Sequence, residues 1–321
     1  MSAATPAVHP RLSLNQATIK YASLAEALRT TADAGIGSIG LWREPVADVG
    51  LDAALALVAD SGLRVSSLCR GGFFTPEPGE ARDAALDDNR RAIDETAALA
   101  AAGAPGSSAT LVLVAGGLPQ GSRDLIGARE RVRDAVGELE ADAASAGVTL
   151  AIEPLHPMYA ADRAVISTLG QALDIAEQFS GTAQFSSTGQ LGGTGQLSGT
   201  GQLGSTGQLS PVVGVVVDTF HIWWDPQVLE QIARAGRGNR IASYQVCDWI
   251  TPLPADVLLG RGMMGDGHID FGPMTRAVTD AGYQGDIEVE IFNQQIWDAP
   301  YADVAARVVA SFAEHVPVPP V

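Results

Sequence analysis

Four oxygen-bearing side chains stand at the ends of apolar runs between residues 149 and 292. They are Glu153 in TLAIEPL, Asp218 in VVGVVVDTF, Gln245 in IASYQVCDW and Glu290 in DIEVEIF. Each residue alone would more often be structural, but four at matching places indicate a shared site. Three carboxylates at one rim would repel one another unless protons or a cation neutralised them. Because carboxylates and an amide carbonyl are hard donors, the set predicts one divalent metal ion, with Mn²⁺ or Mg²⁺ favoured and Co²⁺ or Zn²⁺ left open.

Two histidines follow these carboxylates at one common spacing. His221 comes three residues after Asp218, and His156 comes three residues after Glu153. Both are candidate substrate-binding residues, and a structural role for each is about equally open, since Asp218 could simply cap a turn beside a satisfied histidine. Four arginines lie in or near the loops that would follow strands, and any one could bind a phosphate or carboxylate group: Arg43, Arg70, Arg163 and Arg261.

The elements that position these residues alternate regularly along the chain. Strands are expected at 11–19, 38–42, 64–69, 110–115, 149–155, 212–218, 241–249 and 286–292. Helices are expected at 23–34, 48–61, 81–102, 122–146, 168–179, 227–235, 271–281 and 301–315, most of them ended by glycine. Eight strand–helix pairs predict an α/β fold, a (β/α)8 TIM barrel whose strand ends meet at one mouth. An open nucleotide-binding sheet is disfavoured, because the turn after the first strand reads NQATI and has no glycine.

One segment interrupts this alternation. The tetrapeptide TGQL occurs four times with a six-residue period between Thr188 and Leu209. So few units cannot bury the core of a β-helix, so a flexible low-complexity insert at about 181–210 of a single 1–321 domain is expected. The insert joins a helix to the next strand, which places it on the barrel face away from the mouth. Deletion of 187–210 should therefore leave turnover within a few-fold.

Composition limits the classes of partner. The formal net charge of −17 argues against a nucleic-acid surface, which needs a basic stripe. No run approaches a membrane span and no signal peptide is evident, so a cytoplasmic protein without a membrane partner is expected. Lys20 is the only lysine, which excludes Schiff-base chemistry elsewhere, and the two cysteines are read as buried thiols. The oligomeric state, a homo-oligomer included, stays open.

The motifs around these residues resemble the xylose isomerase-like TIM-barrel superfamily of sugar isomerases and epimerases. They are EPLHP at 153–157, DxxH at 218–221, GDGHIDF at 265–271 and EVEIF at 288–292. The resemblance implies that Glu153, Asp218, Gln245 and Glu290 bind the metal. Gln245 stands where ketose epimerases have histidine, which is more similar to the hydroxypyruvate isomerase and dehydroshikimate dehydratase branches. Glu288 is the rival of Glu290 but lies deeper along its strand.

The chemistry implied is proton transfer beside a carbonyl of a small carbohydrate-like substrate: a sugar, a sugar phosphate or a hydroxy-keto acid. Glu153 and Glu290 would be the catalytic acid/base pair, acting through a metal-stabilised enediolate. A dehydratase of the inosose or dehydroshikimate type on the same scaffold is the nearest alternative. An endonuclease would need more histidines and a basic groove, and a non-catalytic sugar-binding barrel would not need the metal set.

Overall fold

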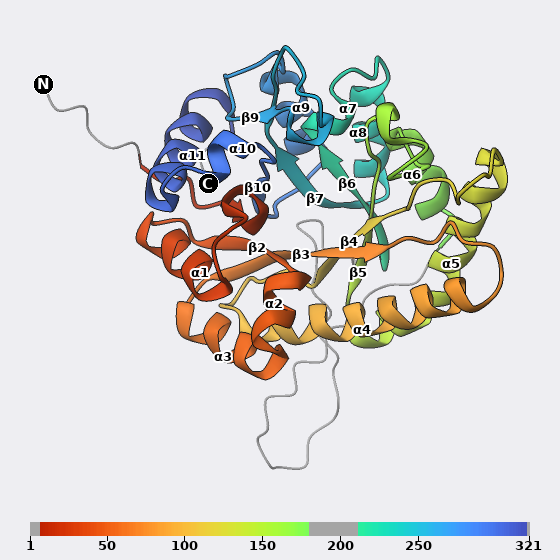
Figure 1. Cartoon of the computed structure of the whole chain (residues 1–321). Coiled ribbons are helices and arrows are strands. Elements are labelled where there is room, and N and C mark those ends of the chain that lie inside the picture. Colours follow the sequence, from red (N-terminus) through yellow and green to blue (C-terminus); the bar gives the residue numbers. More distant parts are fainter. Residues whose placement is uncertain (1–6, 180–210, 320–321) are drawn as a thin grey trace, which may run out of the picture.

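The computed structural model describes residues 7–179 and 211–319, and its centre is a closed barrel of eight parallel strands (Figure 1). The strands follow one another around the barrel in chain order, and β10 closes it against β1. They are β1 (Leu12–Asn15), β2 (Ser38–Trp42), β3 (Arg64–Gly72), β4 (Thr110–Val114), β5 (Thr149–Glu153), β6 (Val213–Asp218), β7 (Ile241–Val246) and β10 (Ile287–Val289). The predicted (β/α)8 TIM barrel is confirmed.

An outer ring of helices connects the strands (Figure 1). Its members are α1 (Leu24–Asp33), α2 (Arg43–Val49), α3 (Leu51–Ser61), α4 (Glu80–Ala102), α5 (Leu125–Ala146), α6 (Leu169–Ala176), α8 (Val228–Arg237), α9 (Phe271–Asp280) and α11 (Tyr301–His315). Short helices follow several strand ends: η1 (Gln16–Ile19), η2 (Pro157–Tyr159), α7 (Thr219–Ile222), η3 (Val257–Leu259) and α10 (Gln294–Trp297). Each ring helix buries an apolar stripe against the strands, so the main core lies between the two layers.

Several elements differ from the expected boundaries, and three of these differences have a clear cause. The expected first strand stops at Asn15, because the Asn15 side chain accepts a hydrogen bond from the Ala17 N–H and caps η1. The expected helix at 48–61 starts only at Leu51, as α3, because Gly50, whose φ of 81° is closed to most residues, separates it from α2, which the pattern did not predict. The expected strand at 241–249 ends at Val246, and β8 (Asp248–Trp249) pairs antiparallel with β9 (Arg261–Gly262) instead.

The inside of the barrel has an apolar half and a polar half. Cys69, Val112, Ala151 and Val216 pack together on one side. On the other side the buried Glu288 carboxylate accepts a 2.9 Å hydrogen bond from Asn15 Nδ2. Residue 40 must be glycine there, because a Cβ at that position would collide with the Glu288 carboxylate. Polar groups therefore continue from the strand ends into the barrel interior.

The predicted insert at about 181–210 lies outside the described residues. Its described neighbours are tied together by Arg240, whose guanidinium donates to the carbonyl oxygens of Phe179 (2.9 Å) and Val213 (2.7 Å). Val213 begins β6, so this junction lies at the opposite end of the strand from Asp218.

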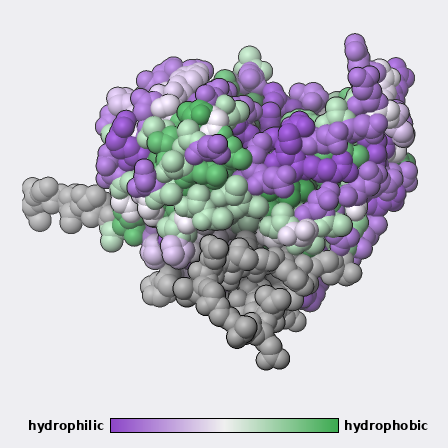
Figure 2. All heavy atoms as spheres, turned by 90° about the horizontal axis from the view of Figure 1, so that it is seen from below, coloured by the Kyte–Doolittle hydropathy of each residue, from purple (hydrophilic) through white to green (hydrophobic). Residues whose placement is uncertain are grey.

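Seen from below, hydrophobic residues gather in the middle of the molecule, and hydrophilic residues dominate to the right (Figure 2). Among the described residues, no helix combines the length and the apolar composition of a membrane span.

Candidate metal centre and active site

The candidate ligands lie at the carboxyl ends of adjacent barrel strands. Glu153 and Asp218 are the last residues of β5 and β6, and Gln245 is the register partner of Asp218 on β7. Glu290 follows the last residue of β10. All four are buried. The barrel thus brings together the four residues that the sequence predicts as a group.

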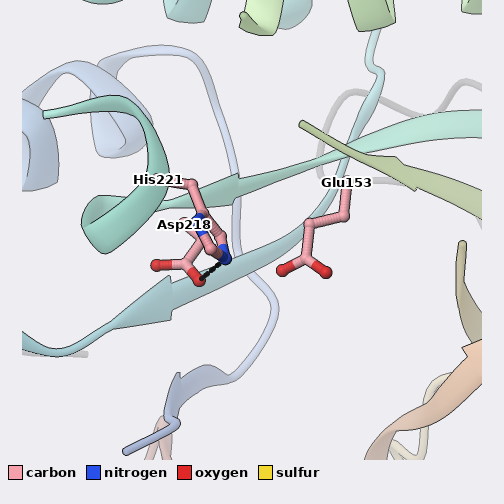
Figure 3. Close-up of side chains that lie close together, drawn as sticks. All are labelled: Glu153, Asp218 and His221. Carbon is pink, nitrogen blue, oxygen red and sulfur yellow. Dashed lines mark ion pairs between the residues drawn. The ribbon is translucent and has the colours of Figure 1, made fainter. Parts of the chain in front are cut away.

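A tight cluster at this mouth consists of Glu153, Asp218 and His221. One ligand atom of each lies within 4.8 Å of the others (Figure 3). The Asp218 and His221 side chains come from the end of β6 and the start of α7, and Glu153 faces them from β5 (Figure 3). Glu290 does not belong to this cluster. It lies against a cation that the protein itself supplies.

That cation is Arg261, in β9. Its Nη1 lies 2.8 Å from Glu290 Oε2 and 3.5 Å from Asp218 Oδ2. The guanidinium is buried between the rings of Phe220 and Phe292, at 4.8 and 4.7 Å from their centroids. Arg261 therefore neutralises part of the acidic cluster from one side. The sequence includes it only among four loop arginines, because nothing near β9 in the chain points to the carboxylates of β6 and β10.

One positive charge is too little for three buried carboxylates. Burial raises the pKa of Asp218 to about 7, with the Glu290 charge adding to it and Arg261 opposing it. Burial together with the charges of Glu290 and Asp218 raises the pKa of Glu153 well above its usual range. Burial also raises the pKa of Glu290, again against Arg261. The carboxylates would ionise fully only with more positive charge beside them, as a divalent ion would provide.

The Gln245 side-chain amide is buried without a hydrogen-bond partner in the described part of the chain. Its Nε2 and Oε1 are buried and have no hydrogen-bond partner among the described residues. Buried amides are rarely left in this state, so a group outside the protein chain would account for it. Gln245 lies in register with Asp218 on one side and with Glu288 on the other. The oxygen donors of Glu153, Asp218 and Gln245 have the chemistry that a hard divalent ion prefers, and Glu290, which is paired with Arg261, stays a predicted ligand.

The two histidines have different surroundings. The His221 Nδ1 accepts a 3.2 Å hydrogen bond from the His156 backbone N–H, and its Nε2 lies 3.1 Å from Arg261 Nη2, a group that can only donate. Burial and the Arg261 charge lower the pKa of His221 far below its usual value, so the ring is neutral. Because both ring nitrogens face donors, these contacts do not assign the ring proton, and His221 stands beside Glu153 and Asp218 as a third group that could ligate a metal.

His156 is held away from the carboxylates. Its ring lies 4.8 Å from the ring of Trp249 and 5.6 Å from that of Trp224, and its Nδ1 accepts from the Met158 N–H. Burial lowers the pKa of His156. His156 is not among the residues that line the cavity next to the carboxylates, which is described below. A substrate-binding role for His156 stays a prediction without support from this geometry.

A cavity of about 180 Å³ opens onto the site. Glu153, His221, Arg261 and Glu290 form part of its wall, and Trp42 and Phe292 form an aromatic part. Two further arginines predicted from the sequence, Arg70 and Arg163, also line it. Arg43 does not, because it is paired with Asp88 and Glu95 at 2.8 and 2.6 Å. The cavity is suited to a small polar substrate in contact with the acidic cluster.

Asp248 is a residue of this region that sequence reasoning did not single out. Its buried carboxylate accepts four backbone N–H bonds, from Trp249, Gly265, Gly267 and Ile269. These bonds fold the GDGH segment back onto β8, next to β9 and Arg261. The sequence contains this aspartate near the end of the expected strand at 241–249 and a glycine-rich segment further on. Their contact is tertiary, so the sequence pattern does not predict it.

The comparisons with known proteins agree with this architecture. A family model described as xylose isomerase-like TIM barrel matches residues 28–185 and 206–313. A solved protein from Sinorhizobium meliloti 1021 is 43% identical, with a TM-score of 0.81 over 95% of this chain and 98% of that one. No curated protein sequence matches the chain.

Two more distant solved structures share the fold. The IolI protein, with a bound zinc atom, is 18% identical with a TM-score of 0.70, covering 95% of this chain and 98% of its own. An L-ribulose 3-epimerase is 20% identical with a TM-score of 0.67, covering 95% of this chain and 94% of its own. The extent of the family match and the similarity to the Sinorhizobium protein show that this chain belongs to the xylose isomerase-like TIM barrel family.

Proposed function

We propose that this protein is a divalent-metal-dependent isomerase or epimerase of a small carbohydrate-like substrate. The observation that carries the proposal is the meeting of Glu153, Asp218, Gln245 and Glu290 at one barrel mouth, with less positive charge than the carboxylates require. Related folds include an L-ribulose 3-epimerase and a 3-keto-D-glucoside 4-epimerase, which supports this class of reaction. Mn²⁺ or Mg²⁺ suits the oxygen donors, and the zinc in IolI keeps Zn²⁺ and Co²⁺ among the ions to test.

Each residue of the site would have a separate role in the transfer of one proton. A bound divalent ion would polarise the substrate carbonyl and acidify the neighbouring C–H bond. Glu153 and Glu290 approach the cavity from different strands, so one carboxylate can remove the proton and the other can return one to a different carbon or face. His221, in the cavity wall, would hold a substrate oxygen, and the surrounding aromatic wall would exclude water from the enediolate.

Deuterium exchange tests this proposal. The metal-loaded protein should incorporate deuterium from heavy water into at least one member of a panel of ketoses, ketose phosphates, inososes and hydroxypyruvate. Glu153→Gln and Glu290→Gln should each reduce exchange by a factor of about 10² to 10⁴, the usual contribution of a general acid or base. Full exchange in Glu290→Gln would refute the acid/base assignment. Formation of a new enone instead of exchange would identify a dehydratase.

A further inference from the structure

We propose that the substrate carries an anionic group, a carboxylate or a phosphate, and that Arg70 and Arg163 bind it at the wall of the cavity. The inference rests on the proposed function and deepens it, since it names the substrate class. Both arginines line the same cavity as Glu153, Glu290 and Arg261. They come from the ends of different strands, Arg70 from β3 and Arg163 from the loop after β5.

Arg70 is held in place by aromatic rings. Its guanidinium carbon lies 5.6 Å from the centroid of Trp42 and 5.0 Å from that of Phe73. The Trp42 ring is itself fixed, because its Nε1 donates a 2.8 Å hydrogen bond to Asn15 Oδ1. Within residues 7–179 and 211–319, no carboxylate lies within ion-pair distance of Arg70. Ring stacking orders a guanidinium while leaving its in-plane N–H donors free for a planar anion.

Arg163 is only loosely paired. Its Nε lies 3.6 Å from Asp162 Oδ2, too far for a hydrogen bond, and this buried Nε has no hydrogen-bond partner among the described residues. Its guanidinium carbon lies 5.6 Å from the centroid of Tyr159, another residue of the cavity wall. A second guanidinium without a hydrogen-bonded carboxylate therefore lines the same cavity.

The charges of the site favour an anionic substrate. Glu153, Asp162 and Glu290 line the cavity with three arginines, and Asp218 lies behind them. Glu288 is a fifth carboxylate, buried and close enough to interact with Glu153 and Glu290. A bound divalent ion and the three arginines would together match these five acidic groups, in a chain whose formal net charge is −17. A neutral sugar would leave Arg70 and Arg163 unpaired beside it, whereas a carboxylate or phosphate would form charge-assisted hydrogen bonds with them.

Three ketones of similar size test the inference by calorimetric titration of the metal-loaded protein. Hydroxypyruvate and dihydroxyacetone phosphate carry the two candidate anions, and dihydroxyacetone is the neutral match to both. At least one anionic probe should bind about 10- to 100-fold more tightly than dihydroxyacetone. Whichever is tighter identifies carboxylate or phosphate as the preferred group. Equal affinity for all three probes would overturn the inference.

Matched variants separate recognition from folding. Arg70→Met and Arg163→Met keep the aliphatic volume and should each weaken the preferred anion about 10-fold or more, with the affinity for dihydroxyacetone unchanged. Arg276→Met, on the exposed face of α9, removes one charge from the outside and should change neither affinity. An equal loss for charged and neutral probes would contradict the inference. Absence of deuterium exchange with every probe would refute the proposed function. The calorimetric comparison would still decide whether Arg70 and Arg163 bind an anionic group.

Discussion

Arg261 is the single residue on which the metal-free site depends most. It is the buried partner of both Asp218 and Glu290, and removal of one member of a buried ion pair usually costs about 3–5 kcal/mol. Arg261→Met should therefore lower the melting temperature strongly in EDTA, and saturating Mn²⁺ should restore much of the loss. Arg90→Met, which removes two exposed ion pairs, with Asp87 on α4 and with Asp142 on α5, is the control and should cost less than about 1 kcal/mol. Equal melting temperatures for Arg261→Met and the wild type in EDTA would contradict this role.

The raised pKa values of the acidic cluster predict a pH-dependent metal affinity. Asp218, with a pKa of about 7, and Glu153, whose pKa is also raised, hold protons in the metal-free protein at pH values where ordinary carboxylates have lost them. Because protonated carboxylates do not ligate metals, affinity should rise as the pH increases from about 5 to 8, and binding should release protons. Calorimetry in two buffers with different protonation enthalpies measures that release. A flat affinity without proton release would contradict the electrostatic account.

The residues that the sequence could predict are those whose place in a strand defines their place in space. Glu153 and Asp218 end runs that could only be buried strands, so a barrel fixes where they meet. Arg261 and Asp248 could not be assigned in this way. Their partners lie on other strands or far along the chain, and a two-residue hairpin pairing such as β8 with β9 leaves no periodic pattern. The unpartnered Gln245 amide likewise depends on what surrounds it.

At the level of elements, the segment from β8 to α9 controls the position of Arg261. Asp248 Oδ1 accepts from the Trp249 and Ile269 N–H groups, and Oδ2 accepts from those of Gly265 and Gly267. An amide can satisfy only one of these two pairs, so Asp248→Asn should lower the free energy of unfolding by about 2–3 kcal/mol. Urea denaturation measures the loss. Asp256→Asn, in an exposed cap that accepts one N–H, is the control and should change little. Equal effects in the two variants would show that the loop does not depend on Asp248.

The strands and ring helices could be predicted from the sequence, because the spacing of their apolar residues and the glycines that end the helices are local signals. Strand β2 occupies the expected residues 38–42, and α11 the expected residues 301–315. The differences arise where a side chain or a backbone angle overrides the period. Asn15 caps η1 and ends β1, and Gly50, with a φ of 81°, separates α3 from α2, a helix that the pattern did not predict. Such local conflicts are decided by hydrogen bonds that the apolar pattern does not encode.

For the whole molecule, closure of the barrel makes the site. β10 pairs with both β1 and β7, so Glu290 meets Asp218 and Arg261 only when the last strand completes the ring. The same closure sets Glu288 beside Asn15 and Gln245 beside Asp218. The acidic cluster is therefore a property of the complete fold, and its buried carboxylates require a counter-charge.

Metal titration of the purified protein measures whether the acidic cluster takes a divalent ion as its counter-charge. The wild type, stripped with chelator and titrated with Mn²⁺, should bind one ion per chain, and Asp218→Asn and Glu153→Gln should each weaken binding by at least about 10-fold while remaining folded. The same titration on Asp286→Asn, at the opposite end of β10, should match the wild type. Failure of the wild type to bind Mn²⁺, Mg²⁺, Co²⁺ or Zn²⁺, or binding that the Asp218 and Glu153 variants leave unchanged, would contradict the account.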